Sequence, residues 1–472
     1  MMHFKTLNGG NAEIRMFLDD DLLATVESGV FDQARDTANT PGVDHVCVLP
    51  DCHTGYGAPI GSVVVSTDRV IPGPVGYDIG CGMAVYTTRV PASVLKDRPA
   101  RRRVIDAIDR GIAMGEGRSA AHGIDIHTSL VLDVVNHGAQ ALAGRGLIPH
   151  TWVKRCENPQ HQVGEWMNLH DVPEKARRGF SQLGTLGGGN HFLELQELKV
   201  EETMRHIADT WGLFDGQLVV MVHSGSRGFG HGLGSWAFDE FKKRNLELGE
   251  TFTHHELVHA PVDSDLGRQY LRFVAAGANF ALCNRLLMAQ VIKRAIEDEL
   301  GEAAEVDLLY EISHNLAQHE GNHLVHRKGT TRAFPAGHPA LVASPWETTG
   351  HPVITPGSMG SFSAIQVGLQ GAAASFYSIN HGAGRRMSRS AARKVIDQAA
   401  LNAEMDAADI LTNQRNAPID EAPAAYKDLG EVLRSVESFN LAAVVARCYP
   451  IASMKGADEP RGSHRKPAPG GQ

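Results

Sequence analysis

Short apolar runs that end in a histidine and continue into a loop constrain the fold of this chain most strongly. Two segments, Leu218–Gly228 (LVVMVHSGSRG) and Val306–Asn315 (VDLLYEISHN), each predict a buried strand with a histidine at its end. A glycine-rich turn, Gln182–Leu195 (QLGTLGGGNHFLEL), enters a third strand-like segment at His191. We therefore expect buried strands whose ends carry polar side chains.

Helices are expected at Lys96–Gly111, Ala275–Leu300 and Met387–Met405. The second of these has apolar residues at helical spacing and is expected to carry Arg and Lys on its outer face. Because strands and helices mix without a regular βαβ rhythm, the expected fold class is α+β, one large domain with mixed sheets and surrounding helices. This domain is expected to span residues 1–456, and the Gly-, Pro- and charge-rich stretch 457–472 is expected to be a disordered tail.

The chain of 472 residues is 42% hydrophobic and 21% charged, which is enough for a large core. It has no run of about 18 apolar residues, and its first residues lack the basic and apolar pattern of a signal peptide. These features predict a cytoplasmic protein without a membrane span. Six cysteines lie far apart with no CxxC pattern, so reduced thiols are expected.

The charged residues give conflicting indications about whether the protein binds nucleic acid. The net charge of −9 argues against a polyanionic partner. Basic residues nevertheless cluster at Lys96–Arg103, Lys175–Arg178 and Gly384–Lys394. Each cluster by itself is typical of a solvated helix face. Because there are three of them, binding of a phosphate-rich partner is not excluded by the net charge.

The polar residues at glycine-bounded strand ends form a candidate metal site. They are one carboxylate, one thiol and three imidazoles: Asp78, Cys81, His191, His223 and His314. All are metal-ligand types, and five of them suit two ions close together with the thiolate as a bridge. Paired ions are a recurrent device in phosphoryl chemistry. The cysteine favours zinc and a phosphate-bearing substrate favours manganese or magnesium, so the residues leave the metal open.

A sixth candidate, His381, lies in the segment INHGAGRRMS. Glycines at this position allow a phosphate to approach the backbone, and an uncharged imidazole is a nucleophile toward phosphorus. A structural histidine in a turn explains the segment equally well. The loop Ile354–Ser363 (ITPGSMGSFS) also offers hydroxyl and N–H groups to a nucleotide, although loops of this composition are common.

Two segments match the zinc-protease pattern H-E-x-x-H, which needs a continuous helix. In His255–His259, Pro261 follows closely and disfavours a helix. In His319–His323, the middle residues are Gly and Asn, which are poor helix formers. Both are therefore interpreted as chance matches. The chain also lacks the GxxxxGK[ST] phosphate loop.

Taken together, the motifs closely resemble the RtcB family of RNA ligases. The matching stretches occur in the family's order over about Leu49–Gly456 and include PDCHTGYGAPIGSVV, VGYDIGCGM, QLGTLGGGNHFLEL, VHSGSRG, ISHN, VHRKGTTRAFPAGHP, PGSMGS, HGAGRRMSR and YPIASMKG. The resemblance implies GTP-dependent joining of RNA 3′-phosphate or 2′,3′-cyclic phosphate ends to 5′-hydroxyl ends. It also implies a buried dinuclear cleft that works with two Mn²⁺ ions.

The resemblance assigns roles to individual residues. It implies that Asp78, Cys81 and His191 hold one Mn²⁺ and that Cys81, His223 and His314 hold the other. It implies that His381 is the nucleophile that becomes guanylylated, and Asp51 is a candidate for orienting the site. The residues implied to contact GTP or GMP are Asn190, His191, Glu194, His314, Asn315, Pro356, Gly357, Ser358, Met359, Ser363, His381, Gly382, Ala383, Gly384 and Lys455.

The alternative to the ligase is a dinuclear metal-dependent phosphodiesterase, which needs the five ligands but neither His381 nor a guanylate pocket. A non-catalytic RNA-binding protein is a weaker alternative, because no metal ligand is missing. For the ligase, the implied partner is RNA with broken ends, either tRNA halves in splicing or cleaved tRNA or rRNA in repair. An activating protein of the archease type is a further candidate partner. The sequence does not distinguish among these RNA substrates.

Overall fold

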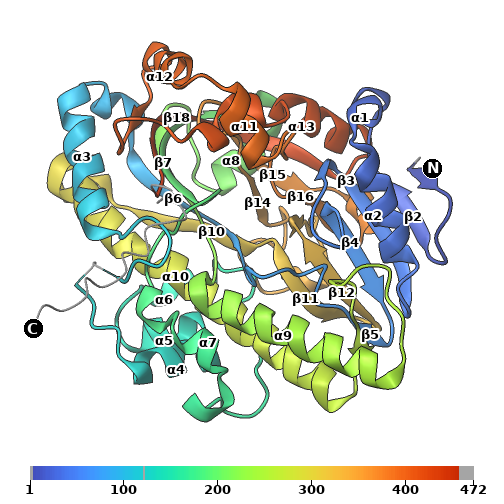
Figure 1. The fold of residues 1–472 in the computed structure, drawn as a ribbon. Helices are drawn as coiled ribbons and strands as arrows, with labels where there is room; N and C mark the ends of the chain where they lie inside the picture. Colours follow the sequence, from blue (N-terminus) through green and yellow to red (C-terminus); the bar gives the residue numbers. More distant parts are fainter. Residues whose placement is uncertain (1–3, 121–122, 457–472) are drawn as a thin grey trace, which may run out of the picture.

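The computed structural model describes residues 4–120 and 123–456. The stretch 457–472, expected to be a disordered tail, lies outside the described residues. Helices and several sheets are mixed along the chain, in agreement with the expected class (Figure 1). Among the described residues, no helix is both long enough and apolar enough to cross a membrane.

The larger sheet has eight strands. His223 lies within it, and His191 and His314 flank two of its strands. Its hydrogen-bonded order is β10 (Asp307–Ser313), β6 (Gly82–Pro91), β8 (Gln217–Ser224), β7 (Phe192–Val200), β18 (Ala442–Met454), β15 (Ser363–Gly368) and β14 (Pro352–Thr355), with β17 (Leu411–Thr412) alongside β18. Every residue of β8 is buried. Successive side chains of a strand point to opposite faces, so Val220 and Val222 enter the core that contains the long helix α10, while Val219 and Met221 enter a second core.

A six-stranded sheet packs beside it in the order β1 (Lys5–Leu7), β2 (Glu13–Met16), β3 (Val43–His53), β4 (Ile60–Ser66), β12 (His323–Lys328) and β11 (Asn315–Glu320). Only the β2–β3 pair is parallel in this sheet of the described chain. Two short ribbons complete the strands: β13 (Thr330–Arg332) with β16 (Ser378–Asn380), and β5 (Arg69–Val70) with β9 (Ala260–Pro261).

Helices surround the sheets. They are α1 (Asp20–Thr25), α2 (Ser28–Ala38), α3 (Arg98–Gly111), α4 (Thr128–His137), α5 (Ala139–Gly144), α6 (His150–Val153), α7 (Glu174–Arg177), α8 (Arg205–Thr210), α9 (Arg227–Leu248), α10 (Asp265–Leu300), α11 (Arg389–Val395), α12 (Gln398–Ala407) and α13 (Leu429–Ser438). Figure 1 shows α9 and α10 side by side across one side of the sheets, and α10 also packs against α3 and α4.

The expected helices are present, with three differences. Helix α10 begins at Asp265 rather than Ala275, because the Ser264 hydroxyl caps it by accepting from the Gly267 N–H. The expected helix Met387–Met405 is two helices, since Asp397 ends the first stretch and caps α12. Arg285, expected on the outer face of α10, is fully buried because its charge is paired with Glu311.

Neither H-E-x-x-H segment is helical. Residues 255–259 form turns and irregular chain, and His319–His323 spans the end of β11, a turn with Gly321 at φ +62°, and the start of β12. The interpretation of both as chance matches is therefore confirmed. All six cysteines are free and buried, as expected for reduced thiols.

Candidate active site

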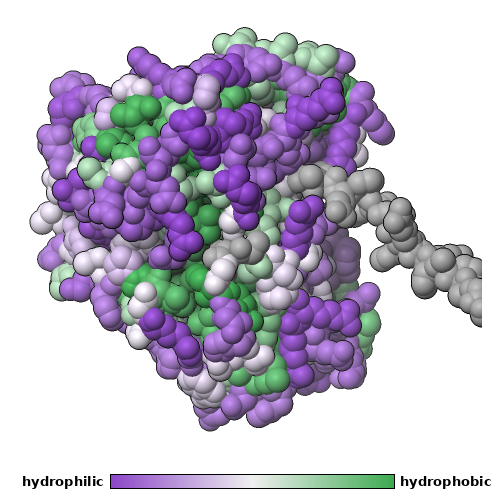
Figure 2. Space-filling model, turned by 90° about the vertical axis from the view of Figure 1, so that its left-hand side faces the viewer, coloured by the Kyte–Doolittle hydropathy of each residue, from purple (hydrophilic) through white to green (hydrophobic). Residues whose placement is uncertain are grey.

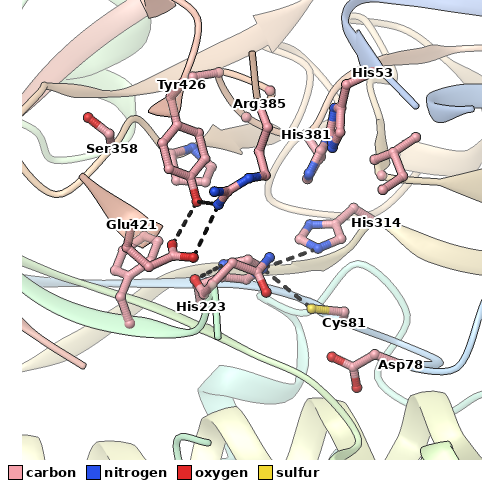
Figure 3. Close-up of a pocket in the computed structure, with 18 of the residues that line it drawn as sticks. His53, Asp78, Cys81, His223, His314, Ser358, His381, Arg385, Glu421 and Tyr426 are labelled. Carbon is pink, nitrogen blue, oxygen red and sulfur yellow. Dashed lines mark hydrogen bonds and ion pairs between the residues drawn. The ribbon is translucent and has the colours of Figure 1, made fainter. Parts of the chain in front are cut away.

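One cavity of about 310 Å³ lies where the two sheets meet (Figure 3). Its metal-ligand candidates come from one end of four neighbouring strands: β6 begins after Cys81, β7 begins after His191, β8 contains His223 near its end, and β10 ends before His314. The pairing register confirms this convergence, since Met83 and Phe192 both lie opposite His223. Residues more than 200 positions apart therefore meet at one sheet end.

The first candidate cluster contains Asp78, Cys81 and His191, whose ligand atoms all lie within 4.8 Å of one another. Nε2 of His191 is 3.0 Å from an Asp78 oxygen and 3.4 Å from the Cys81 sulfur. Burial opposes ionisation of Asp78, but the His191 contact and the Arg227 charge outweigh it and hold the pKa of Asp78 below its usual range. The carboxylate is thus ionised and available to a cation.

The second candidate cluster contains Cys81, His223 and His314. Nε2 of His223 lies 3.4 Å from the Cys81 sulfur and 3.3 Å from Nε2 of His314. Figure 3 shows these three side chains grouped below His381. Cys81 belongs to both clusters, so its sulfur occupies the position of a shared ligand.

The hydrogen bonds of the ring nitrogens fit a metal site. Nδ1 of His191 donates to the carbonyl of Leu186, and Nδ1 of His223 donates to the carbonyl of Asn190, each at 3.1 Å. Carbonyls only accept, so Nδ1 of each ring carries a proton, and Nε2 of each ring faces the Cys81 sulfur, that of His191 also facing the Asp78 carboxylate. Two ring nitrogens and one carboxylate gathered around one sulfur form a donor set that a cation stabilises.

The environment of the Cys81 thiol disfavours its ionised form. Burial, reinforced by the charge of Asp78, raises the pKa of the Cys81 thiol well above its ordinary value. Without a cation the sulfur is therefore protonated, whereas a coordinating thiol is deprotonated by the ion. This donor set of one carboxylate, one thiolate and three imidazoles is compatible with a pair of divalent metal ions.

Arg285 ties together the loops beneath both clusters. Its guanidinium donates to the carbonyls of Gly80 and Ser224 at 2.9 and 2.6 Å and to the hydroxyl of Ser313 at 3.2 Å. Each partner is a near neighbour in sequence of a ligand candidate. Sequence reasoning missed this role, although a lone arginine within the apolar pattern FALCNRLLMA was a usable signal.

His381 lies in the same cavity, with its ring centroid 5.0 Å from that of His314. The carboxylate of Asp51, which is fully buried, accepts hydrogen bonds from Nδ1 of His381 at 2.7 Å and from the backbone N–H groups of His381 and Gly382. Nδ1 is therefore protonated, and Nε2 keeps a free lone pair. A histidine held in this way has a fixed orientation, which is what a nucleophilic imidazole requires.

Twelve of the residues expected to contact guanylate line this cavity: Asn190, His314, Asn315, Pro356, Gly357, Ser358, Met359, His381, Gly382, Ala383, Gly384 and Lys455. His191, Glu194 and Ser363 are absent from its lining in the described chain. His191 contacts the lining residue Cys81 at 3.4 Å, Ser363 accepts from the N–H of the lining residue Gly357 at 3.1 Å, and Glu194 accepts from the Ser453 hydroxyl at 2.9 Å. Burial raises the pKa of Glu194 to about 7.

A polar network opposite the histidines was not anticipated. It contains Arg385, Arg389, Glu421 and Tyr426, all of which line the cavity together with Lys455. Glu421 accepts from the Tyr426 hydroxyl at 2.6 Å and from Lys455 Nζ at 3.2 Å. The two arginines belong to the basic cluster Gly384–Lys394, but the acidic partner lies in the segment PIDEAP, which has no motif to mark it.

Sequence comparison agrees with these observations. The profile of the family described as "tRNA-splicing ligase RtcB" matches residues 33–456. A tRNA-splicing ligase RtcB of Thermococcus kodakarensis is 35% identical over 466 residues, covering 94% of each chain. An RNA-splicing ligase RtcB of Mycobacterium tuberculosis is 34% identical over 443 residues, covering 90% of this chain and 100% of the relative. The chain therefore belongs to the RtcB family of RNA-splicing ligases, and it is an enzyme.

Proposed function

We propose that this protein joins RNA 3′-phosphate or 2′,3′-cyclic phosphate ends to 5′-hydroxyl ends in a GTP-dependent reaction. The observation that carries the proposal is the position of His381, which is oriented by Asp51 and lines one cavity together with members of both candidate metal clusters. A hydrolase using the same metals has no need of a histidine nucleophile held in this way.

Two Mn²⁺ ions are the proposed metals, one held by Asp78, Cys81 and His191 and the other by Cys81, His223 and His314. When bound, they offset the negative charge that develops on phosphate oxygens. Asp51 keeps the proton of His381 on Nδ1, so Nε2 attacks the α-phosphorus of GTP. A P–N bond forms as the P–O bond to pyrophosphate breaks.

The GMP then passes from His381 to the RNA 3′-phosphate, which releases Nε2 and gives that phosphate a good leaving group. A 5′-hydroxyl attacks the activated phosphate, the new phosphodiester forms, and GMP departs. A 2′,3′-cyclic phosphate must first be opened by hydrolysis. The glycine-bounded N–H groups of the Gly382–Gly384 loop and the charge of Lys455 support a guanylate beside His381.

The names of the relatives refer to tRNA splicing and RNA splicing. For this chain we propose RNA with broken ends as the substrate, either tRNA halves or cleaved tRNA or rRNA. An activating protein of the archease type is proposed as a partner. RNAs that co-purify with a His381→Ala variant would identify the substrate.

A radiolabelled adduct tests the central step. Incubation of the protein with α-labelled GTP and Mn²⁺ is expected to label the protein through a phosphoramidate, which is stable to alkali and labile to acid. The His381→Ala variant is expected to remain unlabelled while keeping the metal content of the wild type. An unlabelled wild-type protein that cleaves phosphodiesters would instead establish the dinuclear phosphodiesterase.

A further inference from the structure

A second cavity, of about 560 Å³, lies away from the candidate active site. The C-terminal end of α9, the β5–β9 ribbon and the first residues of α10 surround it. In Figure 1 this region is at the right-hand end of the α9–α10 pair, close to β5. The cavity is within the size range of about 300–1,000 Å³ that small-molecule sites occupy.

The N-terminus of α10 opens onto this cavity. The helix is 36 residues long, and Ser264, Asp265 and Leu266 at its start are lining residues. The N–H groups of Asp265 and Leu266 have no hydrogen-bond acceptor among the described residues. Free N–H groups and the helix dipole together favour a negatively charged ligand.

His259 provides an independent indication of a ligand. Its side chain is only 1% exposed and lines the cavity, yet neither ring nitrogen makes a hydrogen bond within the described chain. The nearest charged group is Glu250, 3.8 Å from Nδ1. Buried polar groups are normally hydrogen-bonded, so an unsatisfied imidazole calls for a partner that the folded chain does not supply.

Three arginines around the cavity favour a negatively charged ligand. Arg69, Arg244 and Arg268 line the cavity, against the two acids Glu250 and Asp265. Arg69 lies 3.6 Å from Glu250, and Arg268 bonds to Asp265, whose own side chain is fully exposed. Arg244 is exposed and has no ion-pair partner among the described residues, so it is free to bind an anion.

We propose that this cavity binds a phosphate group through the N-terminus of α10, His259 and Arg244. The lining has no aromatic ring apart from His259, which argues against recognition of a nucleobase. If the protein acts on RNA as proposed above, the phosphate belongs to the backbone of the substrate strand. A free phosphate is the other source of the same chemistry.

The length of α10 gives the distance from the candidate metal site. Gly80, between Asp78 and Cys81, packs against α10 at Ala278, since a Cβ on Gly80 would lie 2.7 Å from the Ala278 Cα. Asp265 precedes Ala278 by 13 residues, which corresponds to about 20 Å of helix. A tRNA half is long enough to span this distance.

Amide hydrogen exchange measured by mass spectrometry tests the site directly. Inorganic phosphate and a tRNA half are added in turn to the intact protein without GTP. Phosphate is expected to slow exchange about ten-fold in the peptide that covers Asp265 and Leu266, because these N–H groups acquire an acceptor. Slowing by the tRNA half as well assigns the site to RNA, whereas slowing by phosphate alone assigns it to a free phosphate.

Arg244→Glu and Lys243→Glu form a matched pair, because both residues are exposed on α9 and only Arg244 lines the cavity. Arg244→Glu is expected to abolish the slowing by phosphate and to weaken binding of the tRNA half about ten-fold. Lys243→Glu is expected to preserve the slowing. Unchanged exchange with every ligand, or equal effects of the two variants, would overturn the proposal, and neither outcome depends on ligation.

Discussion

The environment of Glu194 predicts that the stability of the protein depends on pH. Its carboxyl is 2% exposed, and burial raises its pKa to about 7, despite hydrogen bonds from Ser453 and Gln196. The folded protein therefore holds the Glu194 proton more tightly than the unfolded chain does, whose reference value is 4.5. The contribution of Glu194 to the unfolding free energy falls as pH rises from about 4.5 to about 7 and is constant above that range.

The Glu194→Gln variant isolates this effect, because its amide does not titrate. We expect the wild type to lose up to about 3 kcal/mol relative to Glu194→Gln as pH increases across this window. The substitution also alters the hydrogen bonds of this side chain. That change shifts the unfolding free energy by the same amount at every pH, so the slope of the free energy against pH is unaffected. Denaturant unfolding of both metal-free proteins from pH 4.5 to 8 measures the difference, and parallel stability curves would contradict the expectation.

At the same scale, the sequence identifies residues whose type and local setting are distinctive. Asp78 and Cys81 lie among glycines, and the histidines end or begin apolar runs, so their convergence was predictable. Arg285 and Glu421 were not, because their roles come from partners distant in the chain, Gly80 and Ser224 for the first and Lys455 for the second. A buried charge becomes interpretable only when its partner is known.

At the level of elements, the turn that carries Asp78 and Cys81 is held against α10. Gly80 has φ +73°, and a Cβ there would lie 2.7 Å from the Cα of Ala278. Gly76, at the start of the same segment, has φ +80°, and a Cβ there would meet no other atom within 4 Å. The two glycines thus share a left-handed backbone and differ in their surroundings.

We predict that Gly80→Ala impairs metal binding far more than Gly76→Ala does. Each substitution adds the strain of a left-handed alanine, about 1–2 kcal/mol. Only Gly80→Ala also forces the turn away from α10, which displaces Cys81 from both clusters. Titration of the purified variants with Mn²⁺ by calorimetry, alongside their melting temperatures, separates the two effects. Equal loss of metal affinity in both variants would show that packing against α10 is unimportant.

The element boundaries that differ from expectation share one cause. Side-chain caps at Ser264 and Asp397 begin helices where apolar periodicity gives no signal, so α10 starts early and α12 is separate from α11. Strand ends were predicted better. Each is marked by a histidine after an apolar run, and the structure places the predicted ends of β8 and β10 beside each other across β6.

For the whole molecule, ion pairing decides which basic clusters can meet RNA. On α3, Arg98 and Arg101 pair with Asp409, and Arg103 pairs with Glu299. These acids come from distant elements, so the sequence could not show that these three arginines are paired. Figure 2 shows the side that carries α3, where the surface is mostly hydrophilic and hydrophobic residues lie in hollows. The cluster Gly384–Lys394 differs, since Arg385 and Arg389 reach the cavity.

Arg386 and Arg103 therefore make a matched test of the RNA surface. Arg386 is exposed beside the cavity and its side chain has no ion-pair partner among the described residues, whereas Arg103 is bound to Glu299 at 2.6 Å. Arg386→Glu is expected to weaken RNA binding uniformly across sequences and to reduce the slope of log affinity against log salt by about 1, as for one lost phosphate contact.

Arg103→Glu changes the net charge by the same amount, so long-range repulsion of RNA is equal in the two variants. Its expected salt slope is that of the wild type, because Arg103 already neutralises an acid and contributes no phosphate contact. Fluorescence anisotropy of a labelled tRNA half over a series of salt concentrations measures both slopes. Equal slopes for Arg386→Glu and Arg103→Glu would mean that net charge, rather than unpaired arginine beside the cavity, governs the approach of RNA.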